Sequence, residues 1–109
     1  SSSYKRIEDN MVLNNILRKY GITKDFFFSL GGNPRKNINR LIKSFSLFKY
    51  KNDFDLVIAG VGVNERVDEY KKLVEKYNLS GNIKILGYIK NNDDLVGLYN
   101  SAYCFVFPS

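Results

Sequence analysis

A basic motif that follows an apolar run is the part of the chain best suited to chemistry. Gly31 and Gly32 come directly after the run Phe26–Leu30, and Arg35 and Lys36 stand at the head of an amphipathic stretch. This order predicts a strand, a glycine turn and a helix. The first turn of a helix has unpaired backbone N–H groups and about half a positive charge, so it stabilises an anion. The residues fit two interpretations equally well: a phosphate or diphosphate site, or an ordinary helix start whose basic side chains are solvated.

Two more glycine turns follow apolar runs farther along the chain. The turn Gly60-Val61-Gly62 lacks the third glycine of a dinucleotide fingerprint, because Glu65 stands in its place. The turn Gly87-Tyr88-Ile89 brings an aromatic side chain that can stack on a base, although a half-buried structural role is the commoner one for Tyr88. Ligands of open parallel sheets bind beyond the carboxyl ends of the strands. Gly62, Tyr88 and Ile89 therefore join the candidate binding residues.

The chain offers no set of side chains for general acid–base, nucleophilic or zinc chemistry. It contains no histidine, and Asp93 and Asp94 are interpreted as helix caps, together with the other candidate N-caps Asn91 and Asn92. Asp55 begins a predicted strand, so it lies at the opposite, amino end of the sheet. Cys104 is the single cysteine and lies in an apolar run, so it is predicted to be a buried strand residue without a disulfide or metal role. We expect neither catalytic residues nor a metal site.

The composition describes one folded domain with a basic surface. The chain has 109 residues, a hydrophobic fraction of 44% and an aromatic fraction of 15%, which exclude a disordered segment. Its formal net charge of +6 favours anionic partners. No RNA-binding motif of interleaved basic and aromatic residues occurs, so a generally basic surface is favoured over a nucleic-acid interface. No apolar stretch approaches the roughly 20 residues of a membrane span, and a soluble, cytoplasmic protein is expected.

Apolar runs and helical periodicities alternate along the chain. Val12, Ile16 and Tyr20 recur at helical spacing and predict a leading helix over residues 9–20. Four strands are predicted over residues 26–30, 55–59, 82–86 and 103–107, and helices near 38–49, 65–77 and 93–101 lie between them. Strands that are apolar throughout and alternate with helices are typical of a doubly wound parallel sheet, an α/β fold with helices on both faces.

Receiver-like signalling domains and other non-catalytic nucleotide-binding domains share this alternation. A receiver requires an acidic cluster after its first strand, whereas this chain has Gly31 and Gly32 at that place. A non-catalytic nucleotide-binding α/β domain stays open as the alternative interpretation.

The motifs of this chain occur in a characteristic order. The first half has Phe28–Ile38 and then Leu41–Phe45, and the second half has Leu86-Gly87-Tyr88-Ile89, Asp94-Leu95, Leu98-Tyr99, Ser101-Ala102 and Phe105–Ser109. In order and spacing, residues 25–109 resemble the C-terminal domain of the family 4 glycosyltransferases, also called glycosyl transferases group 1. The resemblance implies the Rossmann-like half of a GT-B fold, with four strands and covering helices.

The resemblance also implies a ligand and a role for several residues. Family members use a nucleotide-diphosphate sugar, so a GDP- or UDP-linked hexose is the implied donor substrate, and the run Pro34–Asn37 favours mannose. Lys36 matches the lysine that grips the diphosphate, while Gly32 stands where many members have an arginine and Arg35 lies beside Lys36. Backbone groups at Tyr88 and Ile89 would hold the base. No bound metal or other prosthetic group is implied.

The same resemblance sets the expected domain boundaries and partners. Residues 1–24 are interpreted as a leading linker and helix, and residues 25–109 as the first part of a donor-binding domain truncated at its C-terminus. The expected partners are the nucleotide sugar, an N-terminal acceptor domain and the rest of the C-terminal domain, without nucleic acid. The isolated chain is expected to be inactive and to self-associate through an exposed sheet edge at residues 103–107. The full-length enzyme is expected in the cytoplasm, at the inner face of the membrane.

Overall fold

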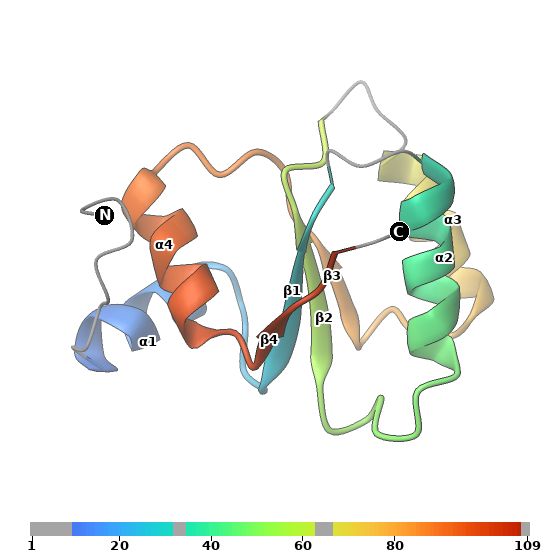
Figure 1. The fold of residues 1–109 in the computed structure, drawn as a ribbon, viewed down its shortest axis with the longest axis horizontal. Helices are drawn as coiled ribbons and strands as arrows, with labels where there is room; N and C mark the ends of the chain where they lie inside the picture. The colour runs from blue at the N-terminus through green and yellow to red at the C-terminus, as the bar shows by residue number, and fades with distance from the viewer. Residues whose placement is uncertain (1–9, 32–34, 63–66, 108–109) are drawn as a thin grey trace.

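Helices and strands alternate along the chain (Figure 1). The computed structural model describes residues 10–31, 35–62 and 67–107, with the side chains at positions 35 and 36 excepted. In chain order the elements are α1 (Asn10–Lys19), β1 (Phe26–Leu30), α2 (Arg35–Ser46), β2 (Asp55–Ala59), α3 (Val67–Lys76), β3 (Ile83–Ile85), α4 (Asn92–Ser101) and β4 (Cys104–Phe105). Within the described residues, the helices are all too short or too polar to cross a lipid bilayer.

The four strands form one parallel sheet in the order β3-β2-β1-β4. Strand β1 is paired on both sides: Phe26 pairs with Asp55 of β2, and Phe27 pairs with Cys104 of β4. Because β4 returns to the far side of β1, the strand order reverses between β1 and β4. The predicted doubly wound parallel sheet is confirmed, with the fourth strand beside the first.

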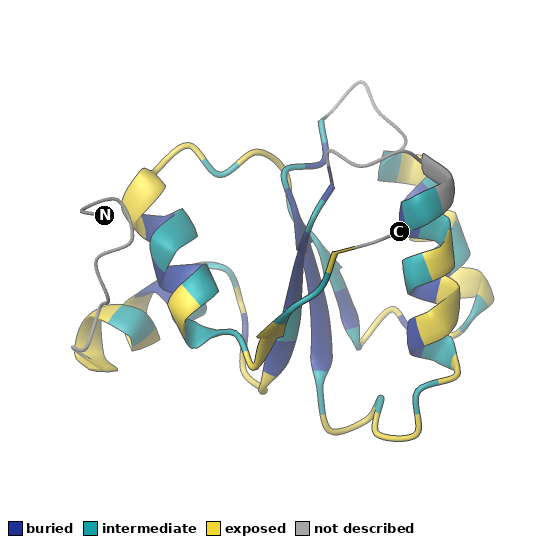
Figure 2. Ribbon diagram, viewed as in Figure 1, coloured by how far each residue is buried: buried dark blue, intermediate teal, exposed yellow. Residues whose placement is uncertain are grey.

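Helices cover both faces of the sheet, α2 and α3 on one face and α1 and α4 on the other (Figure 1). Successive side chains of a strand point to opposite faces, so each face needs its own apolar set. All five residues of β2 are buried, which explains the nearly uninterrupted apolar run of this strand. Figure 2 shows that the strands hold much of the buried surface, while exposed residues lie on the outer helix faces and the loops.

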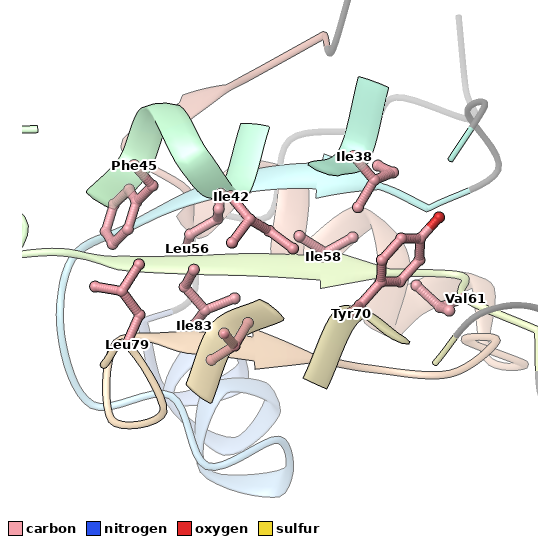
Figure 3. Packing of buried hydrophobic residues seen from close by; sticks show 10 residues of the cluster. Ile38, Ile42, Phe45, Leu56, Ile58, Val61, Tyr70, Leu79 and Ile83 are labelled. Carbon is pink, nitrogen blue, oxygen red and sulfur yellow. The ribbon is translucent and has the colours of Figure 1, made fainter. Parts of the chain in front are cut away.

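The buried apolar side chains form two core clusters, one on each face of the sheet. The α2/α3 core consists of Ile38, Ile42, Phe45, Leu56, Ile58, Val61, Tyr70, Val74, Leu79 and Ile83 (Figure 3). The α1/α4 core consists of Ile16, Ile22, Phe26, Phe28, Val57, Ala59 and Leu98. Full burial of one such aliphatic or aromatic side chain contributes about 1.5–3 kcal/mol relative to exposure, so these two layers are the main source of stability.

The first turn of α2 lies earlier in the chain than predicted. The helix begins at Arg35 instead of near residue 38, and it ends at Ser46. Beyond that end, the Leu47 N–H donates to the Ser44 carbonyl at 3.1 Å, which tightens the last turn. The early start places Arg35 and Lys36 at the head of the helix. The predicted start of the next helix, at residue 65, lies outside the described residues.

Strand β4 is shorter and more exposed than predicted. It covers Cys104–Phe105 instead of residues 103–107, and within the described residues it has a neighbouring strand on one side only. Cys104 is exposed, so the prediction of a buried cysteine is wrong. An apolar run marks a strand, but this side chain would be buried only if a second strand or a covering helix packed over it.

Candidate functional site

The turns that follow β1, β2 and β3 are joined by backbone hydrogen bonds at one edge of the sheet. The Gly31 N–H donates to the Ala59 carbonyl at 2.6 Å. The Gly60 N–H donates to the Gly87 carbonyl at 2.9 Å. The three glycine turns singled out in the sequence therefore lie side by side, because the carboxyl ends of parallel strands meet at the same edge.

Gly31 is buried where the first two of these turns meet. A Cβ at this position would lie 2.4 Å from Cγ2 of Val61 and 3.3 Å from the Ala59 carbonyl oxygen. A heavy atom at 2.4 Å overlaps this methyl group, so any side chain at Gly31 would force Val61 or the turn to move. Gly62 follows Val61 and is half-buried at the same edge. The sequence predicts Gly31 and Gly62 as binding residues, and the structure adds this packing role for Gly31.

The start of α2 lies at this edge of the sheet because the apolar face of the helix packs against the sheet. Ile38, Ile42 and Phe45 recur at helical spacing and are buried in the α2/α3 core (Figure 3). Arg35 and Lys36 are the first two residues of the helix, whose first turn contains no acidic residue. Gly32 lies outside the described residues, as do the side chains of the basic pair. The backbone thus brings a helix N-terminus and two cationic residues to the glycine turns.

The turn after β3 is anchored on its inner side and open on its outer side. The Leu86 N–H donates to the Ile58 carbonyl at 2.8 Å, which extends the contact with β2 beyond the strand. Ile89 is half-buried and packs against the α1/α4 core. Tyr88 is 79% exposed, so the prediction of a half-buried structural role is wrong, and the exposed ring is compatible with stacking on a ligand.

A hollow of about 360 Å³ lies beside this turn, between the ends of β2 and β3 and the start of α3. Val61, Val67 and Ile85 provide apolar walls, and Asp68 and Lys71 provide charged groups. Val67, Asp68 and Lys71 of α3 are not among the binding residues predicted from the sequence, because their pattern is typical of an ordinary amphipathic helix.

The first turn of α4 carries a hydrogen-bond network that the sequence did not reveal. Asn91 is the N-cap of the helix, as predicted, and its side chain accepts from the Asp93 N–H at 2.8 Å. Asp94 is not the cap, so that prediction is wrong. Its Oδ2 accepts from Nζ of Lys19 and from the hydroxyl of Tyr20, both at 2.6 Å. Lys19 and Asp94 are 75 positions apart, so no local pattern could have paired them.

The ionisation of this network follows from its hydrogen bonds. The bonds from Lys19 and then Tyr20 hold the pKa of Asp94 below its usual value, against the opposing effect of burial. The hydrogen bond to Asp94 raises the pKa of Lys19. Burial, followed by the bond to Asp94, raises the pKa of Tyr20. The network is therefore charged at neutral pH, with an ionised Asp94 and a protonated Lys19.

The described residues contain no group of three or more carboxylate, thiol or imidazole side chains that could hold a metal ion. Asp55 lies at the amino end of β2, where it pairs with Phe26, away from the glycine turns.

The point where the strand order reverses is the usual ligand-binding place in an open parallel sheet. In this chain that point lies between β1 and β4, next to Gly31 and the start of α2. The fold is thus a doubly wound α/β domain in which the turn at Gly31 and the start of α2 lie at the switch point.

The family to which this domain belongs follows from comparison with known sequences. The family model described as "Glycosyl transferases group 1" matches residues 13–109. The chain therefore belongs to the glycosyl transferases group 1 family, and the resemblance seen in its motifs is confirmed.

Curated relatives of the chain include mannosyltransferases from Escherichia coli. The serotype-specific mannosyltransferase WbdA is 36% identical over 94 residues, which cover 84% of this chain and 12% of WbdA. A further WbdA sequence is 33% identical over the same length. The chain thus spans a small part of the length of these relatives.

Solved structures share the fold at low sequence identity. Sucrose-phosphate synthase from Thermosynechococcus elongatus superimposes with a TM-score of 0.66 at 22% identity, over 92% of this chain and 27% of that protein. The C-terminal domain of the glycosyl transferase group 1 family protein LpcC from Francisella tularensis has a TM-score of 0.66 at 18% identity, over 95% of this chain and 55% of that domain. These matches show that the chain has the α/β fold of the GT-B glycosyltransferases.

Proposed function

We propose that this chain forms part of the donor-binding site of a glycosyltransferase that transfers a hexose from a nucleotide-diphosphate sugar to a glycan or lipid-linked acceptor. The observation that carries the proposal is the start of α2 at the switch point of the sheet, with Arg35 and Lys36 in its first turn beside the buried Gly31. Membership of the glycosyl transferases group 1 family supports glycosyl transfer as the reaction.

In this proposal, protein groups balance the negative charge of the diphosphate. Free N–H groups of α2 and the cations of Arg35 and Lys36 bind the two phosphates and stabilise the negative charge that grows on the leaving nucleoside diphosphate. These groups offset the negative charge of the diphosphate, as a bound metal does in other enzymes, so we propose transfer without a metal. Backbone groups of Tyr88 and Ile89 bind the base.

The identity of the sugar is proposed from the relatives. WbdA is described as a mannosyltransferase, and it is 36% identical to this chain. We therefore favour a GDP-linked mannose, with a UDP-linked hexose as the second donor class. Because the chain spans 12% of WbdA, we propose that the acceptor site and the remainder of the donor site come from other parts of a longer cytoplasmic protein at the inner face of the membrane.

Calorimetric titration of GDP into the wild-type chain and into Lys36→Ala tests the proposal. A charge-assisted hydrogen bond contributes about 1.5–3 kcal/mol, so Lys36→Ala should weaken GDP binding roughly 10-fold to 100-fold. Arg35→Ala should cost less if its side chain is solvated. Lys43→Ala is the matched control, because Lys43 is exposed on the same helix nearer its end.

The same titrations identify the donor class. UDP in place of GDP compares the two bases, and GMP in place of GDP removes one phosphate, which should weaken binding. The proposal fails if the wild-type chain binds neither GDP nor UDP, or if Lys36→Ala binds GDP as tightly as the wild type.

A further inference from the structure

Helices α1 and α4 lie side by side on one face of the sheet (Figure 1). They approach closely at Gly97, where a Cβ would lie 2.4 Å from Cδ1 of Ile16. Ile16 and Leu98 are both buried in the α1/α4 core at this contact. The position of α4 on the sheet is therefore tied to the position of α1.

Asp94 adds a polar contact between the two helices near the start of α4. It is 6% exposed, and one of its oxygens accepts from both Lys19 and Tyr20 at the end of α1. The side chain of Lys19 is 56% exposed, so its attraction to Asp94 is weakened by solvent. The buried carboxylate nevertheless has two donors, and loss of either donor leaves it poorly solvated. These bonds hold the first turn of α4 against α1.

The turn that precedes α4 is held at both ends. On the sheet side, the Gly60 N–H donates to the Gly87 carbonyl at 2.9 Å. On the helix side, Asn91 caps α4, and Asp94 follows one turn later. The exposed Tyr88 lies between these two anchors. The position of the loop at Tyr88 therefore depends on how the start of α4 packs against α1.

We propose that Asp94 is a positioning residue for nucleotide binding, which fixes the turn at Tyr88 and Ile89 by docking the start of α4 onto Lys19 and Tyr20. The inference rests on the proposed function, which assigns the base to this turn. Asp94 itself touches no ligand in this scheme. The binding of the base then depends on α1, which lies far from Tyr88 and Ile89 in the sequence.

Amide hydrogen exchange measured by NMR tests the positioning directly, without a ligand. Asp94→Asn removes the charge and keeps the shape, and Lys19→Met and Tyr20→Phe each remove one donor. Each variant should speed the exchange of the Gly60 and Leu95 amides, which donate to the carbonyls of Gly87 and Asn91 at the two ends of the turn, about 10-fold, because local opening becomes easier, while strand amides keep the wild-type exchange rate. Asp93→Asn, in the same helical turn and exposed, is the control.

Calorimetry separates a positioning role from a merely structural one. Asp94→Asn should weaken GDP binding about 5-fold to 10-fold and leave inorganic pyrophosphate binding unchanged, because pyrophosphate needs the start of α2 but not the base turn. Equal losses for GDP and pyrophosphate, or no loss for either, would overturn the inference. Unchanged exchange at Gly60 and Leu95 would overturn it as well. If the wild type binds neither GDP nor pyrophosphate, the proposed function fails, and the exchange data still decide whether Asp94 fixes the turn.

Discussion

Asp55 and Asp94 are buried carboxylates whose surroundings act in opposite directions. Asp55 is 2% exposed, and within the described residues its Oδ1 has no hydrogen-bond partner. Burial raises the pKa of Asp55, and the charges of Lys84 and Lys24 oppose this only in part. Hydrogen bonds from Lys19 and Tyr20 lower the pKa of Asp94. The same type of residue therefore responds to pH according to its partners.

The two residues should affect the pH dependence of stability with opposite signs. Asp55 has a raised pKa in the folded state, so its favourable contribution is present below the unfolded pKa and is lost as pH rises through the folded pKa. Asp94 has a lowered pKa, so its contribution is present above the unfolded pKa and is lost as pH falls through the folded pKa.

We expect Asp55→Asn to gain stability relative to the wild type, by roughly 1 kcal/mol, as pH rises from about 3 to 7. Asp94→Asn should lose stability relative to the wild type over the same range. Urea unfolding of the three proteins at a series of pH values measures both trends, and Asp93→Asn serves as an exposed control. Parallel curves for the wild type and Asp55→Asn would show that Asp55 has the same pKa in the folded and unfolded chain.

At the scale of elements, the contact between the turns after β1 and β2 is the tightest point of the candidate site. Gly31→Ala would place a methyl group 2.4 Å from Cγ2 of Val61, with the Ala59 carbonyl 3.3 Å away. Relief of this overlap requires the Val61 side chain or the backbone to shift, which costs about 1–3 kcal/mol in a well-packed core. We expect this loss in the free energy of unfolding, measured with urea.

Two variants make the Gly31→Ala result specific. Gly81→Ala is the control, because a Cβ there meets no atom within 4 Å and the same stability is expected as in the wild type. Val61→Ala removes the clashing methyl, so the double variant should be more stable than the sum of the single effects predicts. Additive effects would mean that Val61 is not what excludes a side chain at Gly31.

At the scale of the whole molecule, β4 is an edge strand of the sheet that the described residues form. No charged residue occurs from Tyr103 to Phe107, and Tyr103, Cys104 and Phe107 are exposed. An apolar groove of about 210 Å³ runs alongside, lined by Phe27, Leu41, Ser44, Phe45, Phe48, Leu56 and Val106. An uncharged edge strand can pair with an identical strand, because two copies present the same apolar residues to each other. Helix α1 does not protect this edge, since it packs on the sheet face beside α4.

We therefore expect the chain to self-associate through β4. Val106→Lys places a charge in the groove beside the edge and should return the protein to a monomer. Light scattering over a concentration series measures the change, and Met11→Lys is the control for the added charge, because Met11 is 73% exposed and lies on α1, which packs beside α4. A wild-type chain that stays monomeric at all concentrations would contradict the expectation.

The sequence by itself determined which elements form and where the candidate site lies. The apolar runs predicted Phe26–Leu30 and Asp55–Ala59 with the bounds that the structure has, because a strand covered on both faces needs apolar residues throughout. The motif order predicted the family, and the alternation of strands and helices predicted a parallel sheet with its glycine turns on one edge. These features are local, so each leaves its own pattern in the chain.

The tertiary structure alone decided which distant groups meet. It showed that Asp94 binds Lys19 and Tyr20 instead of capping its helix. It also showed that a side chain at Gly31 would overlap Val61, and that Cys104 is exposed. Each of these depends on how helices and strands pack against one another across many positions. A single hydrogen bond or steric overlap between residues far apart leaves no periodicity in the sequence, whereas burial of a whole helix face does.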